Sequence, residues 1–234
     1  GSSRATFMAS TAMSRAADIV VEKALPIAAN MLEADITDVE FVDGAFVVVG
    51  TDRSFPLLAV ATEARKQGQS LDTYYHFERD ALTWPNGCHA AVVALDQDTG
   101  RVRLLHYLTA DDHGVMVNPM LVEGQSHGAI MQGVSQALLE QLQYDQSGQL
   151  LTGSYMDYAM PRADDLPEFD THFLPTRCTT NPVGVKGAGE PGAIAGYPAV
   201  ANAIADALHQ HGCEEGDFRG IASSQAIWER LREH

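Results

Sequence analysis

The sequence predicts an α+β fold, in which strands and helices are mixed without the regular alternation of βαβ units. Three observations lead to this class: a strong hairpin signal near residue 43, a second pair of strand-like segments around residue 98, and a long apolar helical segment after residue 124. The sequence has no internal repeat, no low-complexity tract and no linker that requires two independent domains. Residues 1–234 are therefore assigned to one domain.

The first predicted elements are a helix and a hairpin. Apolar side chains recur at helical spacing over residues 9–32, and Pro26 is expected to break or kink this helix near Leu25. In the segment 39–49, Asp43-Gly44 stands between two runs of β-forming residues. An Asp-Gly pair in this position predicts a tight β-hairpin.

A short helix and a second pair of strands follow. Ser54 is expected to cap a helix that runs to about Arg65, and residues 66–73 are polar enough to form a loop. Segments 90–95 and 102–108 are expected to form strands on either side of a turn rich in Asp, Thr and Gly.

The last part of the chain is expected to be mainly helical. Residues 124–142 carry few charges and many small side chains, which is typical of a helix that packs on several sides. Residues 171–175 form a short extended piece, and Pro198 fits the first turn of another helix. Ser223 or Ser224 is expected to cap the last helix.

Composition excludes several classes of function. The chain has 31 acidic and 15 basic residues and a net charge of −16, which would repel nucleic acids and anionic membranes, although a solvated surface alone explains such a charge. No apolar run approaches the roughly 18 residues of a membrane span.

Three scattered cysteines without a CxxC pair argue against a zinc or iron–sulfur site held by this chain and favour free thiols in a reducing, cytoplasmic setting. The chain opens without methionine and is interpreted as a processed product or a piece of a longer protein.

The segment most indicative of chemistry is Lys186-Gly-Ala-Gly-Glu190, within a glycine-rich stretch over residues 181–192. Closely spaced glycines let the backbone approach another object and present N–H groups to it. A carboxylate held at the end of such a loop, beside a bound cofactor, is suited to act as a base. By spacing alone, Glu190 could equally be the ordinary N-terminal charge of a helix at a surface turn.

Two further segments are suited to anions. Residues 111–119 form a polar loop before an apolar helix, whose N-terminus attracts anions, and Gln125 adds one acceptor and two donors. Residues 1–6 combine small hydroxylated side chains with Arg4, which suits a phosphate, but they could also be a frayed terminus or a vector remnant. Four histidines show no metal-binding spacing and are expected at the surface or the edge of the core: His76, His89, His113 and His127.

Taken in order, these segments resemble the carboxy-terminal part of the molybdenum-binding subunit of the xanthine dehydrogenase family. This family of molybdenum hydroxylases includes xanthine dehydrogenases, aldehyde oxidases and aerobic carbon monoxide dehydrogenases. The resemblance covers nearly the whole chain, and the joint order of its motifs is specific even though no single one is decisive. The motifs are Trp84–His89, Asp96–Gly100, Asp112–Pro119, Gly124–Gly128, Gln132-Gly133 and Lys186–Glu190.

The resemblance implies a role for each matching residue. Glu190 corresponds to the catalytic base, which takes a proton from a hydroxyl ligand of molybdenum, and Gln125 reaches an oxo ligand of the metal. No residue of the chain is implied as a direct metal ligand, because molybdenum is held through the pterin. The residues implied to bind the cofactor are Ser3, Arg4, Ala5, Thr6, Asn118, Gln125, Lys186, Gly187, Ala188 and Gly189.

The same resemblance implies an incomplete enzyme. The fold would be the second, carboxy-terminal portion of the molybdopterin-binding region, with the cofactor in its cytosine dinucleotide form. The expected partners are the remainder of the molybdenum subunit, an iron–sulfur subunit with [2Fe–2S] clusters and an FAD subunit, so that the chain alone would be inactive. The reaction would be hydroxylation of an aldehyde, N-heterocycle or similar carbon with water as oxygen source. The alternatives are a non-catalytic assembly module and a free-standing binder of small molecules.

Overall fold

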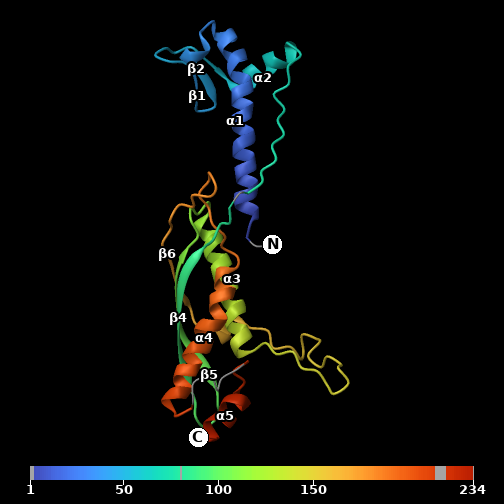
Figure 1. Cartoon of the computed structure of the whole chain (residues 1–234), viewed down its shortest axis with the longest axis vertical. Coiled ribbons are helices and arrows are strands. Elements are labelled where there is room, and N and C mark those ends of the chain that lie inside the picture. The colour runs from blue at the N-terminus through green and yellow to red at the C-terminus, as the bar shows by residue number, and fades with distance from the viewer. Residues whose placement is uncertain (1–2, 80, 214–219, 234) are drawn as a thin grey trace. The chain divides into compact units, whose positions relative to one another are not determined.

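The computed structural model describes residues 3–79, 81–213 and 220–233, and it confirms the α+β class (Figure 1). The chain divides into two compact units, one formed by Gly1–Thr6 and Ala81–His234 and the other by Phe7–Asp80. This division was not visible as a linker in the sequence. The assignment of all 234 residues to one cofactor-binding domain stays a prediction.

The smaller unit packs a helix against an antiparallel sheet. Helix α1 (Ala5–Leu32), a 3-10 turn η1 (Ile36–Asp38), strands β1 (Val39–Val42), β2 (Ala45–Val48) and β3 (Ser54–Pro56), and helix α2 (Leu57–Lys66) follow in order. The sheet order is β1-β2-β3. The predicted hairpin is confirmed: Asp43 and Gly44 have φ angles of 49° and 82°, the left-handed values that a tight two-residue turn requires.

In this unit, the break predicted at Pro26 and the helix cap predicted at Ser54 were wrong. Helix α1 begins at Ala5 and continues through Pro26 without a break. Proline removes one backbone donor, but Ala24 and Ala28 on either side are fully buried, so packing holds the helix together. Ser54 caps no helix, because it pairs with Val47 as part of the edge strand β3, and α2 begins after this strand.

The larger unit has a three-stranded sheet with two long helices on it. Strands β4 (Asn86–Leu95) and β5 (Val102–Asp112) are antiparallel, and β6 (Phe169–Phe173) runs parallel to β5 in the order β4-β5-β6. The remaining elements are α3 (Pro119–Leu138), a 3-10 turn η2 (Ala163–Asp165), α4 (Pro191–Gln210) and α5 (Ser224–Arg232).

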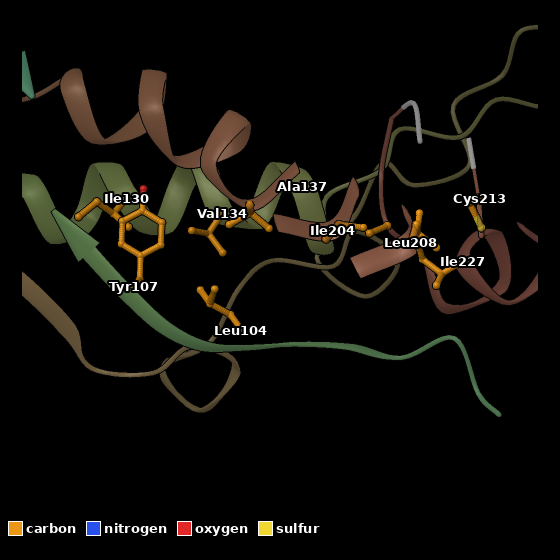
Figure 2. Close-up of a cluster of buried hydrophobic side chains, with 11 residues drawn as sticks. Leu104, Tyr107, Ile130, Val134, Ala137, Ile204, Leu208, Cys213 and Ile227 are labelled. Carbon is orange, nitrogen blue, oxygen red and sulfur yellow. The ribbon is translucent and has the colours of Figure 1, made fainter. Parts of the chain in front are cut away.

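Apolar side chains fill the space between this sheet and the helices. Figure 2 shows Leu104 and Tyr107 of β5 facing Ile130 and Val134 of α3, with Ile204 of α4 continuing the cluster. All five are at most 8% exposed, so β5 and the helices α3 and α4 share one core.

Several boundaries in the larger unit differ from the predictions. Helix α3 begins at Pro119 rather than at residue 124, because Asn118 caps it by accepting a hydrogen bond from Leu121 N at 3.2 Å. Helix α4 begins at Pro191, so Pro198 lies inside it rather than in its first turn. The cap of α5 is Ser223, one of the two residues predicted for that position.

The strands are longer than the sequence indicated. Strand β5 continues to Asp112, so the two aspartates that were assigned to a loop end a strand instead. Strand β5 is extended because it pairs with β4 on one side and with β6 on the other. Both sets of pairs continue beyond the apolar residues of β5 to its aspartates. The three cysteines are free thiols, as expected. Within the described residues, no helix has the length and apolar character needed to cross a membrane.

Candidate functional site

An open pocket of about 550 Å³ lies in the larger unit, at the end of β5. Three segments that the sequence singled out meet there: residues 3–6, residues 113–125 and residues 185–189. Every residue predicted to bind the cofactor is in its lining, namely Ser3, Arg4, Ala5, Thr6, Asn118, Gln125, Lys186, Gly187, Ala188 and Gly189. Their proximity is established by the fold, whereas their roles stay predictions.

Two helices begin at this pocket. Helix α1 begins at Ala5 and α3 at Pro119, and residues of the first turn of both helices line the pocket. The N-terminus of a helix carries a partial positive charge, although in α3 Pro119 has no N–H and Leu121 N already donates to Asn118. Arg4 adds a further positive charge at this end of a protein of net charge −16.

One side of the pocket is built around Asp112. Its Oδ1 accepts hydrogen bonds from Gly114 N at 2.9 Å and Thr176 N at 3.0 Å, and its Oδ2 accepts from Lys186 Nζ at 2.6 Å and from the Thr176 hydroxyl. Burial tends to raise the pKa of Asp112, but the hydrogen bonds from Lys186 and Thr176 outweigh it and hold that pKa well below its usual value.

The glycine-rich loop is tied to the end of β5 by its backbone as well. Lys186 N donates to His113 O at 2.8 Å, and Val115 N donates to Gly184 O at 2.9 Å. The ammonium of Lys186 is engaged with Asp112 and its side chain is only 9% exposed. The charge of Lys186 is therefore paired with the carboxylate of Asp112 within the protein, although the residue borders the pocket.

A buried polar network lies behind this loop. Asp111 accepts from His89 Nε2 at 3.0 Å and from Thr109 Oγ1 at 2.7 Å, and the Nδ1 of His89 is 2.7 Å from Tyr107 Oη. Burial, together with the charge of Asp111, raises the pKa of Tyr107 well above its usual value. His113 completes the network, with its Nε2 3.9 Å from Asp111 Oδ2.

This network was not predicted from the sequence. His89 and His113 were expected at the surface or the core edge, and both side chains are at most 2% exposed. A signal was present, since Tyr107, Thr109 and Asp111 alternate along one strand and must share a face. The burial of these polar groups was not evident, because it depends on His89 of the partner strand β4.

Glu190, the predicted base, is not among the residues that line the pocket; it follows Gly189, which does, and is the N-cap of α4. It makes no capping hydrogen bond, and its Oε2 instead lies 3.5 Å from Ser3 Oγ, which can donate to it. The side chain is exposed. Glu190 thus stands at a helix N-terminus, as the surface-turn interpretation required, but its carboxylate contacts a pocket residue rather than the helix.

Gln125 approaches the same place from α3. A Cβ atom added at Gly189 would lie 3.3 Å from Ser3 Oγ and 3.4 Å from Gln125 Oε1, so these residues converge around a position without a side chain. Glu190 follows directly in the chain. The backbone at Gly189 forms a cradle, and around it lie the amide of Gln125, the hydroxyl of Ser3 and the carboxylate of Glu190.

Glycines in the helices allow α3 and α4 to approach closely. A Cβ atom at Gly133 of α3 would lie 2.8 Å from Ala193 O, and one at Gly192 of α4 would lie 2.6 Å from Ile130 N. Both contacts are to backbone atoms, which cannot give way easily. This close packing fixes the helix that carries Gln125 against the helix that Glu190 begins.

Comparisons with known proteins identify the family of the chain. The family model described as "Molybdopterin cofactor-binding domain" matches residues 1–167, which leaves Lys186–Glu190 outside the matched segment. The chain is 38% identical over 217 residues to the 6-hydroxypseudooxynicotine dehydrogenase complex subunit gamma of Paenarthrobacter nicotinovorans, covering 88% of this chain and 27% of the relative. It is 32% identical over 238 residues to the carbon monoxide dehydrogenase large chain of Hydrogenophaga pseudoflava, covering 99% and 29%.

The fold is also similar to a solved structure. The crystal structure of the Cu,Mo-CO dehydrogenase in its carbon monoxide reduced state matches with a TM-score of 0.88 and 27% sequence identity, over 99% of this chain and 30% of that chain. The chain therefore spans less than a third of the length of these relatives.

Proposed function

The chain belongs to the family of molybdopterin cofactor-binding domains, as the motifs predicted, and from this premise we propose that it supplies the catalytic base and part of the cofactor pocket of a molybdenum hydroxylase. The observation that supports this most is the convergence of Ser3, Gln125 and Gly189 beside Glu190. The reaction would be hydroxylation of an aldehyde, N-heterocycle or similar carbon, with water as the oxygen source.

Two features of the pocket support this cofactor, a close backbone cradle and positive charge. A Cβ atom at Gly187 would lie 2.6 Å from Ser3 Cβ, so a side chain there would collide with the opposite wall of the cradle. The N-terminal turns of α1 and α3, with Arg4, provide donors and positive charge for a pyrophosphate or pterin. We propose the cytosine dinucleotide form of the cofactor. When bound, it would supply the two-electron oxidation of the substrate.

The residues of the chain would divide the remaining work. Glu190 would accept a proton, at a carboxylate oxygen, from the water-derived oxygen that is transferred to the substrate. Gln125 would orient the cofactor with its amide, and Ser3 would hold the carboxylate of Glu190 by donating to Oε2. Lys186 would act indirectly, since its ammonium holds the loop to Asp112.

The rest of the enzyme would come from other segments. The relatives are named as a complex subunit and a large chain, and this chain covers under a third of each. We propose that the remainder of the molybdenum subunit, an iron–sulfur subunit with [2Fe–2S] clusters and an FAD subunit complete a cytoplasmic enzyme, and that this chain alone has no turnover.

The test is Glu190→Gln in the complete enzyme, which keeps the size of the side chain but removes the base. We expect a loss of roughly 10²–10⁴-fold in kcat, the range for a positioned general base, with the molybdenum content unchanged. Glu229→Gln is the matched control, since it makes the same change at an exposed carboxylate of α5. An unchanged rate for the Glu190 variant would instead support a non-catalytic assembly module. Equilibrium dialysis of the chain alone against small ligands would show whether it is a free-standing binder.

A further inference from the structure

His113 is a buried side chain that joins the end of β5 to the glycine-rich loop. It follows the last residue of β5, and its side chain is 1% exposed. Its Nδ1 lies 2.8 Å from Gly187 O, across 74 positions of sequence. A carbonyl oxygen only accepts hydrogen bonds, so Nδ1 must carry the hydrogen.

The second ring nitrogen is also engaged. His113 Nε2 lies 3.3 Å from Ser126 Oγ, one position after Gln125 on α3. This contact joins the imidazole to α3. One imidazole therefore bridges the loop and the helix whose side chains converge on the pocket.

The carbonyl that His113 holds belongs to the tightest part of the cradle. Gly187 lies so close to Ser3 that an added Cβ would be 2.6 Å from the serine Cβ, so this peptide has His113 on one side and Ser3 on the other. Gly189 and Glu190 follow within three residues. A shift of the Gly187 peptide would thus move both the cradle and the carboxylate.

The fixed position of His113 comes from its surroundings. Phe173 of β6 meets the imidazole edge to face, with ring centroids 5.6 Å apart. Asp111 lies 3.9 Å from Nε2 but is already bonded to His89 and Thr109, so it does not compete for the ring. Such outer partners orient the groups that act directly, and a small displacement of those groups lowers rates strongly.

We propose that His113 is a positioning residue, which holds the Gly187 peptide through Nδ1 and α3 through Nε2 and so sets where Glu190 and Gln125 stand at the cofactor. This inference rests on the proposed function and deepens it. It adds a residue that borders the pocket and acts through the loop and the helix that it joins.

The experiment compares two His113 variants in the complete enzyme. His113→Leu removes both hydrogen bonds and leaves the Gly187 carbonyl without its donor. His113→Asn places an amide N–H where Nδ1 stood and can restore that bond. We expect the Leu variant to lose about 10²-fold in kcat with KM little changed, and the Asn variant to recover most of that loss.

A second readout does not depend on turnover. Because Gly187 and Gly189 form the cradle, molybdenum retained per complex after prolonged dialysis should fall in His113→Leu and recover in His113→Asn. His127→Leu is the matched control, since this histidine of α3 also bonds a hydroxyl, Thr171 Oγ1 at 3.0 Å, and within the described residues its hydrogen bond and its ring contact are both with β6. It should keep both kcat and molybdenum retention.

The outcomes separate this inference from the proposed function. Wild-type kcat and retention in His113→Leu, while Glu190→Gln is inactive, would overturn the role of His113 alone. Equal losses in the Leu and Asn variants would also overturn it, because the bond to Gly187 would then not be the cause. If the Leu variant does not assemble, Ser126→Ala removes only the bond at Nε2 and should lower kcat several-fold, and a wild-type kcat there counts against the proposal.

Discussion

Two groups of residues at the pocket are held in different ways. One group, which we call the polar side, consists of His113 and Lys186, which line the pocket, and of Asp111 and Asp112, which contact them. These four side chains are at most 13% exposed and are joined by hydrogen bonds and an ion pair. The other, which we call the apolar side, consists of Val115, Val117 and Leu121, whose side chains are 39%, 73% and 62% exposed.

This difference assigns different tasks to the two sides. The polar side obtains its geometry from bonds within the chain, so it can fix the glycine-rich loop before any ligand is present. The apolar side makes few such bonds and offers surface for contact instead. Substitutions on the polar side should therefore change the stability and the loop position, whereas those on the apolar side should change binding.

The largest effect is expected from Asp112→Ala. It leaves the Lys186 ammonium, which is 9% exposed, without its carboxylate, and it removes the acceptor of Gly114 N and Thr176 N. Leaving a buried charge unpaired costs about 3 kcal/mol or more of unfolding free energy. Urea unfolding followed by tryptophan fluorescence measures it, since Trp84 and Trp228 both belong to the larger unit.

The pH dependence gives the control for this variant. The folded-state pKa of Asp112 is lowered, so its contribution is fully present above the unfolded value of about 3.9 and is lost as pH falls through the folded pKa. The stability difference between wild type and Asp112→Ala should thus shrink in acid. A difference that stays constant from neutral pH into strong acid would show that the ionised carboxylate is not responsible.

A smaller effect is expected from Gly133→Ala, at the contact that sets α3 against α4. The new Cβ would lie 2.8 Å from Ala193 O and 2.9 Å from Gly196 Cα, and forced overpacking of this kind costs about 1–3 kcal/mol. Gly128→Ala on the same helix is the matched control, because nothing lies within 4 Å of its added Cβ and alanine favours a helix. Equal free energies of unfolding for the two variants would contradict this prediction, because they would show that α3 and α4 can move apart without loss of stability.

The smallest change in stability is expected from Leu121→Ala on the apolar side. Its side chain is 62% exposed, and surface substitutions of this kind usually stay within about 0.5 kcal/mol. Molybdenum retention in the complete enzyme should nevertheless fall modestly, because Leu121 lines the pocket. A loss of stability as large as that of Asp112→Ala would remove the distinction between the two sides.

Local signals in the sequence were sufficient for many of the elements. Asp43-Gly44 specified its turn and Ser223 its cap, because each depends on neighbouring backbone atoms. The starts of α3 and α4 were missed although Pro119 and Pro191 stand at the first helical position, which is a local signal too. Ser54 carried a signal for a cap, but pairing with β2 overrode it.

By itself, the sequence determined the family of the chain and identified ten of the residues that line the pocket, from Ser3 to Gly189. Only the tertiary structure decided how those residues are held. The pairs His113–Gly187 and Asp112–Lys186 are each 74 residues apart. Neither leaves a periodic or local trace in the sequence, because a hydrogen bond or ion pair between distant segments depends on the strand and loop that bring them together.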